Sequence, residues 1–402
     1  MSLCFLFACQ QDDDDETIIV VDREVEVFSN IGFNRFDPAI GPQDFILDED
    51  GSIVVVGTQN EFSVRQPTLV KINPQKELSW LEVLEVDQRA IYRDIDIIPT
   101  IDDRYMVLTY SDSATDPGFK INLTKVWPDG QVEWNKRIEE IDEEVRSSSI
   151  VQLSNGDYVV FGRIQEENPT ISNKLILSRI SAEGQIVWSE VMEHTGVLVA
   201  RQLSYFPSDG SLIALSEHSE STLLLTKEVK VHKFDLDGNV IWQQSIMAPG
   251  LLSSESSHLV PIRNEQFMVL FSSDRTGTFD DFDVFLKKMD LDGNIEWEQN
   301  YRGNGSDIPR DIVQTNDDNF IMLSTTSSFG NGGLDIMLTK LDSNGEILWD
   351  KVYGSGASDQ GNKLEQRENG NLLILGSTNH LNSSESIFDF FILETDADGI
   401  SQ

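Results

Sequence analysis

The hydrophobic positions of this chain fall in short runs, separated by clusters of Gly, Asn, Asp and Ser. Residues 310–353 show this most clearly, with four runs at Arg310–Thr315, Phe320–Thr325, Asp335–Leu341 and Glu346–Tyr353. Runs of this length between turn-forming residues predict β-strands joined in an antiparallel meander. No long stretch has apolar residues at helical spacing, so we expect few helices.

The same meander recurs along the chain. The phrases KFDLDGNVIW at 233–242, KMDLDGNIEW at 288–297 and KLDSNGEILW at 340–349 are near copies. Six tryptophans stand in the same phase, about 50 residues apart: Trp80, Trp134, Trp188, Trp242, Trp297 and Trp349. A period of this length indicates one supersecondary unit copied in tandem.

Three copies contain a strong hairpin signal before the Trp. Asp-Gly or Asn-Gly pairs stand at 237–238, 292–293 and 344–345, and the Trp follows four residues after the Gly. Gly accepts the positive φ that tight hairpin turns need. Because side chains alternate along a strand, the fixed spacing sends every Trp to the same face. We expect these rings to pack between neighbouring sheets.

Seven copies are counted from their first strands, which begin near Gln43, Arg93, Ser147, Arg201, His258, Arg310 and Asn362. Stacked four-stranded sheets bury their faces by closing into a ring. The sequence therefore predicts an all-β, seven-bladed propeller of four-stranded antiparallel blades over residues 23–402. The seventh copy reaches Gln402 without a fourth strand, while Arg23–Phe28 (REVEVF) alternates like a strand. We expect this N-terminal strand to complete the last blade; the alternative is that residues 17–30 are a linker.

The repeat phrase K-L-D-x-x-G-x-x-x-W, with Y-G-S-G at 353–356 and N-G-x-x-x-x-G-S-T at 369–378, resembles the tandem propeller repeats of secreted and surface proteins of the Bacteroidota. The Gly-to-Trp spacing also resembles that of quinoprotein propellers. Those usually have eight blades and a cofactor pocket, whereas this chain has seven copies and no pocket signature, so no cofactor is expected. The resemblance implies the fold and leaves the function open.

Composition narrows the classes of partner. The formal net charge of the 402 residues is −39, which disfavours nucleic acid and anionic lipid surfaces. The charge is explained either by solubility or by an acidic face for cations or basic partners. Cys4 and Cys9 are the two cysteines, so no disulfide framework holds the repeats together. We expect a monomeric propeller.

The N-terminus resembles the end of a bacterial lipoprotein signal peptide. Leu6-Phe7-Ala8-Cys9 has the form of a processing box, which makes Cys9 the expected lipidation site and residues 1–9 a partial signal peptide. Residues 10–22 contain five consecutive acids at 12–16 and predict a flexible, solvated tether. The resemblance implies a lipid anchor through Cys9 in the outer membrane, with the protein facing the cell exterior. The alternative is a cytosolic protein with an apolar start.

No catalytic or metal-binding residue is assigned from the sequence. The DLDGN turns at 235–239 and 290–294 have Gly in fourth place, where a calcium loop of the EF type has it in sixth, so they are read as hairpins. The five histidines show no metal-ligand spacing and stand in no recognisable nucleophile motif.

Four basic residues recur near the starts of first strands, and they are our candidate ligand-binding residues: Arg93, Arg201, His258 and Arg310. If first strands line the channel, these side chains surround one mouth and could bind a carboxylate, sulfate or uronate group. The alternative is that Arg93 and Arg310 form ion pairs with Asp94, Asp311 or a neighbouring blade.

The loops between second and third strands vary most and share one rim, which makes that rim the default interaction surface. Together these patterns favour a surface-exposed binding or scaffold module for a glycan or another cell-envelope protein. The alternative is a polysaccharide lyase or hydrolase that uses the channel mouth.

Overall fold

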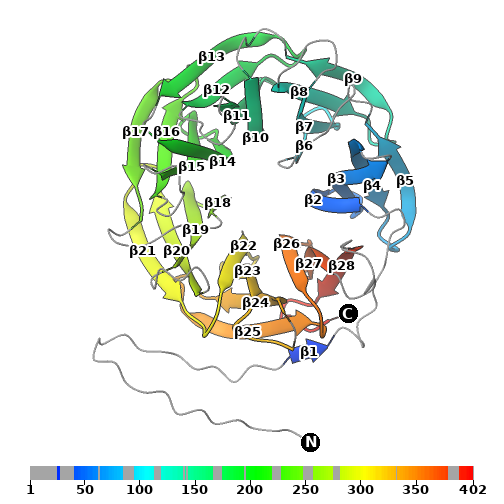
Figure 1. Cartoon of the computed structure of the whole chain (residues 1–402), viewed down its shortest axis with the longest axis vertical. Helices are drawn as coiled ribbons and strands as arrows, with labels where there is room; N and C mark the ends of the chain where they lie inside the picture. The colour runs from blue at the N-terminus through cyan, green and yellow to red at the C-terminus, as the bar shows by residue number, and fades with distance from the viewer. Residues whose placement is uncertain are drawn as a thin grey trace, which may run out of the picture.

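The computed structural model describes residues 25–27, 40–61, 64–84, 95–112, 119–138, 141, 144–165, 174–193, 196–219, 228–247, 257–274, 281–331, 333–378 and 389–401. Within these ranges the chain forms strands and turns and no helix, and therefore contains no helical segment suited to crossing a bilayer. Seven antiparallel sheets stand around a central axis, as Figure 1 shows. The predicted propeller is confirmed.

Each blade begins with a first strand beside the axis. These strands are β2 Ile40–Leu47, β6 Asp96–Pro99, β10 Glu144–Gln152, β14 Val197–Phe206, β18 Ser257–Ile262, β22 Asp307–Gln314 and β26 Asp359–Gln366. The second strands are β3 Ile53–Glu61, β7 Tyr105–Asp112, β11 Tyr158–Gln165, β15 Ser211–Ser219, β19 Gln266–Asp274, β23 Phe320–Thr326 and β27 Leu372–Thr378. Their central residues are almost wholly buried because neighbouring blades cover both faces.

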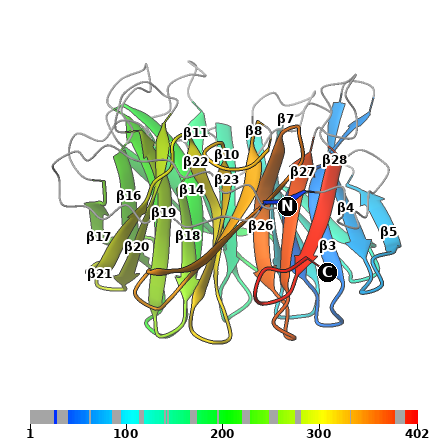
Figure 2. The same ribbon diagram turned by 90° about the horizontal axis from the view of Figure 1, so that it is seen from below.

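Third strands follow outward, and six blades end in an outer strand. The third strands are β4 Val64–Ile72, β8 Phe119–Val126, β12 Lys174–Ile180, β16 Glu228–Asp235, β20 Phe282–Asp290, β24 Asp335–Leu341 and β28 Asp389–Thr395. The outer strands are β5 Leu78–Val83, β9 Val132–Arg137, β13 Ile186–Glu193, β17 Val240–Ser245, β21 Ile295–Tyr301 and β25 Ile347–Gly354. Seen from the side in Figure 2, the short turns gather on one face of the ring.

The tryptophans do pack between sheets. In five blades the indole lies over the turn glycine of the following blade: Trp80 on Gly130, Trp188 on Gly238, Trp242 on Gly293, Trp297 on Gly345 and Trp349 on Gly399. All five glycines have positive φ, between 73° and 93°. The Gly and Trp residues that recur in the sequence thus form the contact between one blade and the next.

The seventh sheet has three strands in the described structure, β26, β27 and β28. The segment expected to complete it lies elsewhere. β1 (Val25–Val27) pairs in parallel with β25 and extends the sixth sheet, as Figure 1 also shows. Closure of the last blade by the N-terminal strand is therefore not shown.

Blades seven and one instead meet face to face. Phe45, Val55 and Val70 of blade one share a buried cluster with Leu375 and Ile392 of blade seven. A hydrogen bond also crosses this seam, because Nη1 of Arg367 donates to the carbonyl oxygen of Gly51 at 2.8 Å. Apolar packing thus joins the two ends of the ring among the described residues.

Candidate functional site

The first strands surround a central cavity with a volume of about 1200 Å³. All seven blades contribute to its wall. The first strands are hydrogen-bonded into the sheets, and sites built on strands are held more precisely than sites on loops. A polar cavity lined by every blade is our candidate site.

Bulges in the first strands aim extra side chains into the cavity. The pairing of first and second strands shifts register in five blades, between Pro42 and Asp44, Ser147 and Ser149, Ala200 and Leu203, Pro309 and Asp311, and Gly361 and Lys363. A bulge places an extra residue on one strand and redirects its side chain. Consecutive residues such as Arg310 and Asp311 therefore both line the cavity.

Three acids on the wall bind the backbone of the next blade. Each accepts a hydrogen bond from a main-chain N–H of the following first strand: Asp44 from Ile97 at 3.4 Å, Asp96 from Ile150 at 3.0 Å and Asp311 from Leu364 at 3.0 Å. These bonds join neighbouring blades around the axis. Asp44, Asp96 and Asp311 thus have a structural role whatever the cavity binds.

The carboxyl of Asp96 binds a proton more tightly than an ordinary aspartate does. Burial raises the pKa of this carboxyl to about 7, and the negative charge of the adjacent Asp44 adds to the effect. Its Oδ2 accepts hydrogen bonds from the Ser149 hydroxyl at 3.1 Å and from the Ile150 N–H. The neighbouring carboxyl groups of Asp44 and Asp96 therefore carry, in total, less than two negative charges.

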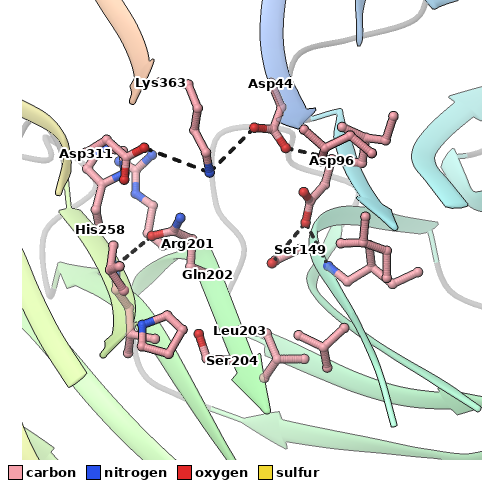
Figure 3. Close-up of a pocket in the computed structure, with 18 of the residues that line it drawn as sticks. Asp44, Asp96, Ser149, Arg201, Gln202, Leu203, Ser204, His258, Asp311 and Lys363 are labelled. Carbon is pink, nitrogen blue, oxygen red and sulfur yellow. Dashed lines mark hydrogen bonds and ion pairs between the residues drawn. The ribbon is translucent and has the colours of Figure 1, made fainter. Parts of the chain in front are cut away.

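Lys363 lies between two acids, as Figure 3 shows. Its Nζ is 3.5 Å from Oδ1 of Asp44 and 4.0 Å from Oδ2 of Asp311. Asp44 first, and then Asp311, hold the pKa of Lys363 well above its usual range, so the ammonium stays charged. Burial raises the pKa of Asp311. This group joins blades six, seven and one.

The structure brings three of the four sequence-predicted residues together. Arg201, His258 and Arg310 all line the cavity on blades four, five and six. Arg93 lies outside the described residues, as does the lipidation candidate Cys9. Most of the variable rim loops also lie outside them, so the rim as an interaction surface stays a prediction.

The two described arginines have protein partners. Arg201 binds Glu217 through two hydrogen bonds of 2.9 Å each, and the Glu217 side chain is fully buried. This is an ion pair within blade four, between β14 and β15. Nε of Arg310 donates to Oγ1 of Thr325 at 3.2 Å.

Positive charge nevertheless converges on His258. Burial lowers the pKa of this imidazole to about 3, and the charges of Arg310, Arg201 and Lys363 lower it further. His258 is therefore neutral at physiological pH. Lys363 acts both on His258 and on Asp44, so cations and acids are interleaved along the cavity wall.

Sequence reasoning missed four charged residues of the site. Asp44, Asp96, Lys363 and Glu365 line the cavity but stand among 69 acids and 30 basic residues with no distinguishing spacing. One signal was available: Asp44, Asp96 and Asp311 each fall in a predicted first strand. The bulges beside Asp44 and Asp311 have no signature in the sequence, and β6, which carries Asp96, pairs without a register shift.

Among the described residues, no three His, Cys, Asp or Glu side chains come together as a metal site would require. The wall chemistry is instead that of hydrogen bonding and ion pairing, with carboxyl groups, a neutral imidazole and cations. Such a surface suits a ligand rich in hydroxyl groups or one carrying an anionic group.

These features define the class of protein as a seven-bladed β-propeller with a polar central cavity. No protein-family model matches the sequence, and no curated protein matches it. Solved structures do share its architecture. One is the α-L-arabinanase of Penicillium chrysogenum complexed with arabinobiose, with 10% identity over 92% of this chain and 98% of that chain, and a TM-score of 0.52.

Two further solved structures are similar. The β-propeller domain of the Trilobed protease from Pyrococcus furiosus, described as having an open velcro topology, is 10% identical over 90% of this chain and 96% of that chain, with a TM-score of 0.52. Puromycin hydrolase is 13% identical over 90% of this chain and 53% of its own, with a TM-score of 0.56, so this chain spans about half its length. Identities this low show the fold alone.

Proposed function

We propose that this protein is a glycan-binding module and that the central cavity is its binding site. The observation that carries the proposal is the cavity wall: about 1200 Å³ is lined by three cations, Arg201, Arg310 and Lys363, and by the carboxyl groups of Asp44, Asp96, Asp311 and Glu365. An oligosaccharide offers hydroxyl groups to the acids, and a uronate or sulfate group suits the cations. The likeness in fold to an arabinanase complexed with arabinobiose agrees with a saccharide ligand.

A binding role is favoured over catalysis because three of the wall acids already stabilise the fold through hydrogen bonds to the next blade. Asp44, Asp96 and Asp311 each accept a main-chain N–H, which leaves them poorly placed to move. Asp44 and Asp96 also lie side by side, whereas a glycosidase holds its two carboxyls roughly 5–9.5 Å apart.

The test is calorimetric titration of the protein with arabinobiose and with an oligogalacturonide at pH 6.5. We expect the acidic saccharide to bind more tightly, and Arg310→Ala to weaken its binding about tenfold or more. Arg310→Lys keeps the charge without the planar fork and should give an intermediate loss. Arg302→Ala is the matched control, since Arg302 pairs with Asp283 and does not line the cavity. Absence of binding to every saccharide tried contradicts the proposal.

Hydrolysis is the second candidate, favoured by one observation. Two carboxyls on the wall, Asp96 and Glu365, have pKa values raised to about 7, the range suited to a general acid. Incubation of the protein with the same saccharides, followed by assay of new reducing ends, decides between the candidates. Product that accumulates with the wild type and not with Glu365→Gln supports hydrolysis.

We further propose that the protein is a lipoprotein anchored through Cys9 in the outer membrane. The support is in the sequence, where Leu6-Phe7-Ala8-Cys9 precedes a run of acids. Cells expressing the protein and fed an alkyne fatty acid should label the wild type and Cys4→Ala but not Cys9→Ala. Protease added to intact cells should degrade the protein if it faces the exterior; label retained in Cys9→Ala contradicts the anchor.

A further inference from the structure

Four acids line the central cavity, and one of them differs from the others. Asp44, Asp96 and Asp311 all accept hydrogen bonds from the backbone. The carboxyl of Glu365 has neither a hydrogen bond nor an ion pair within 4.0 Å among the described residues. It is therefore the wall acid whose hydrogen-bonding capacity is left for a ligand.

The position of Glu365 on its strand directs it to the cavity. It stands two residues after Lys363 in β26, and side chains two apart point to the same face of a strand. Both residues line the cavity. The backbone of Glu365 is paired with Leu373 of β27, so the Cα position is held by the blade while the side chain is free to meet a ligand.

We propose that Glu365 binds the saccharide in its acid form, donating its carboxyl O–H to a ligand oxygen, so that binding is coupled to the uptake of a proton. This inference rests on the proposed function. A saccharide hydroxyl or ring oxygen accepts such a bond, whereas an ionised carboxylate can only accept. A uronate group accepts it more strongly still, because bonds to charged acceptors are short and strong.

The surroundings of Glu365 favour the acid form. Burial raises its pKa to about 7. The charged groups around it are Lys363 on its own strand, which lowers the pKa, and Asp311 of β22 and Asp44 of β2, which raise it. An anionic ligand would add another negative charge and raise the pKa further. The proton is therefore drawn in when the ligand binds.

The experiment is a titration with the oligogalacturonide at several values between pH 6 and 8.5, in buffers of differing ionisation enthalpy. For the wild type, we expect affinity to fall about tenfold for each unit above pH 7, with uptake of about one proton at pH 8. Glu365→Gln carries a permanent N–H donor and should bind with little dependence on pH. Glu365→Ala should bind weakly throughout.

The matched control is Glu368→Gln, the same change three residues later at an exposed turn position. This variant should keep the wild-type dependence of affinity on pH. Affinity that is flat or rises with pH in the wild type overturns the inference. So does a Glu365→Gln protein that retains the slope, since Asp96 titrates in the same range and would then be responsible. Binding with the wrong pH dependence defeats this inference alone, whereas no binding at pH 6 defeats the proposed function itself.

Discussion

Trp242 of blade four lies over Gly293 of blade five. Its ring atoms are 3.3 to 3.4 Å from the place where a Cβ on Gly293 would stand. The indole Nε1–H donates to the carbonyl oxygen of Leu291 at 3.1 Å. The glycine therefore does two things: it takes a φ of 87°, which closes its hairpin, and it leaves room for the ring of the preceding blade.

Gly293→Ala should destabilise the fold, because it strains the backbone and pushes a methyl group against the indole. We expect a loss of about 1–3 kcal/mol in the free energy of unfolding, measured from the urea midpoint. Gly356→Ala is the control, since nothing lies within 4 Å of its Cβ position and its φ is not positive. Equal midpoints for the two variants would show that the contact is unimportant.

Arg201→Ala should lower the free energy of unfolding by more than Gly293→Ala does, because it leaves the buried carboxylate of Glu217 without its cation. Removing one partner of a buried pair typically costs about 3–5 kcal/mol. The double variant Arg201→Ala with Glu217→Gln should recover part of this loss, since a neutral amide still accepts the 2.8 Å hydrogen bond from the Ser257 hydroxyl. Urea unfolding of the wild type, the single variant and the double variant measures the order of their stabilities. An Arg201→Ala protein as stable as the wild type would refute the structural role and leave this arginine for the ligand.

Asp96 should make stability fall as pH rises. Its folded pKa of about 7 lies above the ordinary aspartate value of 3.8, so the folded state binds the proton more tightly. The stability from this group is complete below about pH 4 and is lost as pH rises through 7. Asp96→Asn, which mimics the acid form, should match the wild type near pH 4.

At pH 8 we expect Asp96→Asn to be the more stable protein, by on the order of 2 kcal/mol. Its amide oxygen can accept the bonds from Ser149 and Ile150, and its amide N–H can donate to Asp44. The measurement is the difference between the two urea midpoints from pH 4 to pH 8. A difference that does not grow with pH would mean that Asp96 is ionised in the folded protein.

The seam between blades seven and one should depend on apolar packing. Leu375→Ala removes a buried side chain there and should cost about 2–5 kcal/mol in the free energy of unfolding. Leu348→Ala is the matched control, because Leu348 is 52% exposed on β25.

Deletion of residues 1–39 tests the N-terminal strand itself. It should shift the urea midpoint less than Leu375→Ala, since β1 pairs over three residues with β25. If the deletion prevents folding while Leu375→Ala is tolerated, then the N-terminal strand closes the ring as the sequence suggests.

Much of the fold could be predicted because its signals are local and repeated. The Asp237-Gly238 turn joins the two strands of one hairpin, Trp242 stands on the second of them, and similar phrases recur in other copies. Seven copies of four short strands leave few ways to bury both faces of each sheet. The placement of β1 could not be predicted, because a strand of three residues can pair with several exposed edges.

The site was predictable only in part. Arg201, His258 and Arg310 were found because they recur at the same phase of the repeat, and they do meet in the cavity. That Arg201 is committed to Glu217 could not be read from the sequence, since the two residues are brought together by a bulge in β14. Glu365 was missed because nothing in its neighbourhood distinguishes it from other acids.

The sequence by itself determined the blade: strand lengths, turn chemistry and the periodic Trp all follow from contacts between residues close in the chain. The tertiary structure alone decided how the blades meet at the axis. There, five bulges and the backbone bonds of Asp44, Asp96 and Asp311 set which side chains face the cavity and which carry protons. Those properties arise from burial and from charges about 50 residues or more apart, which local patterns do not encode.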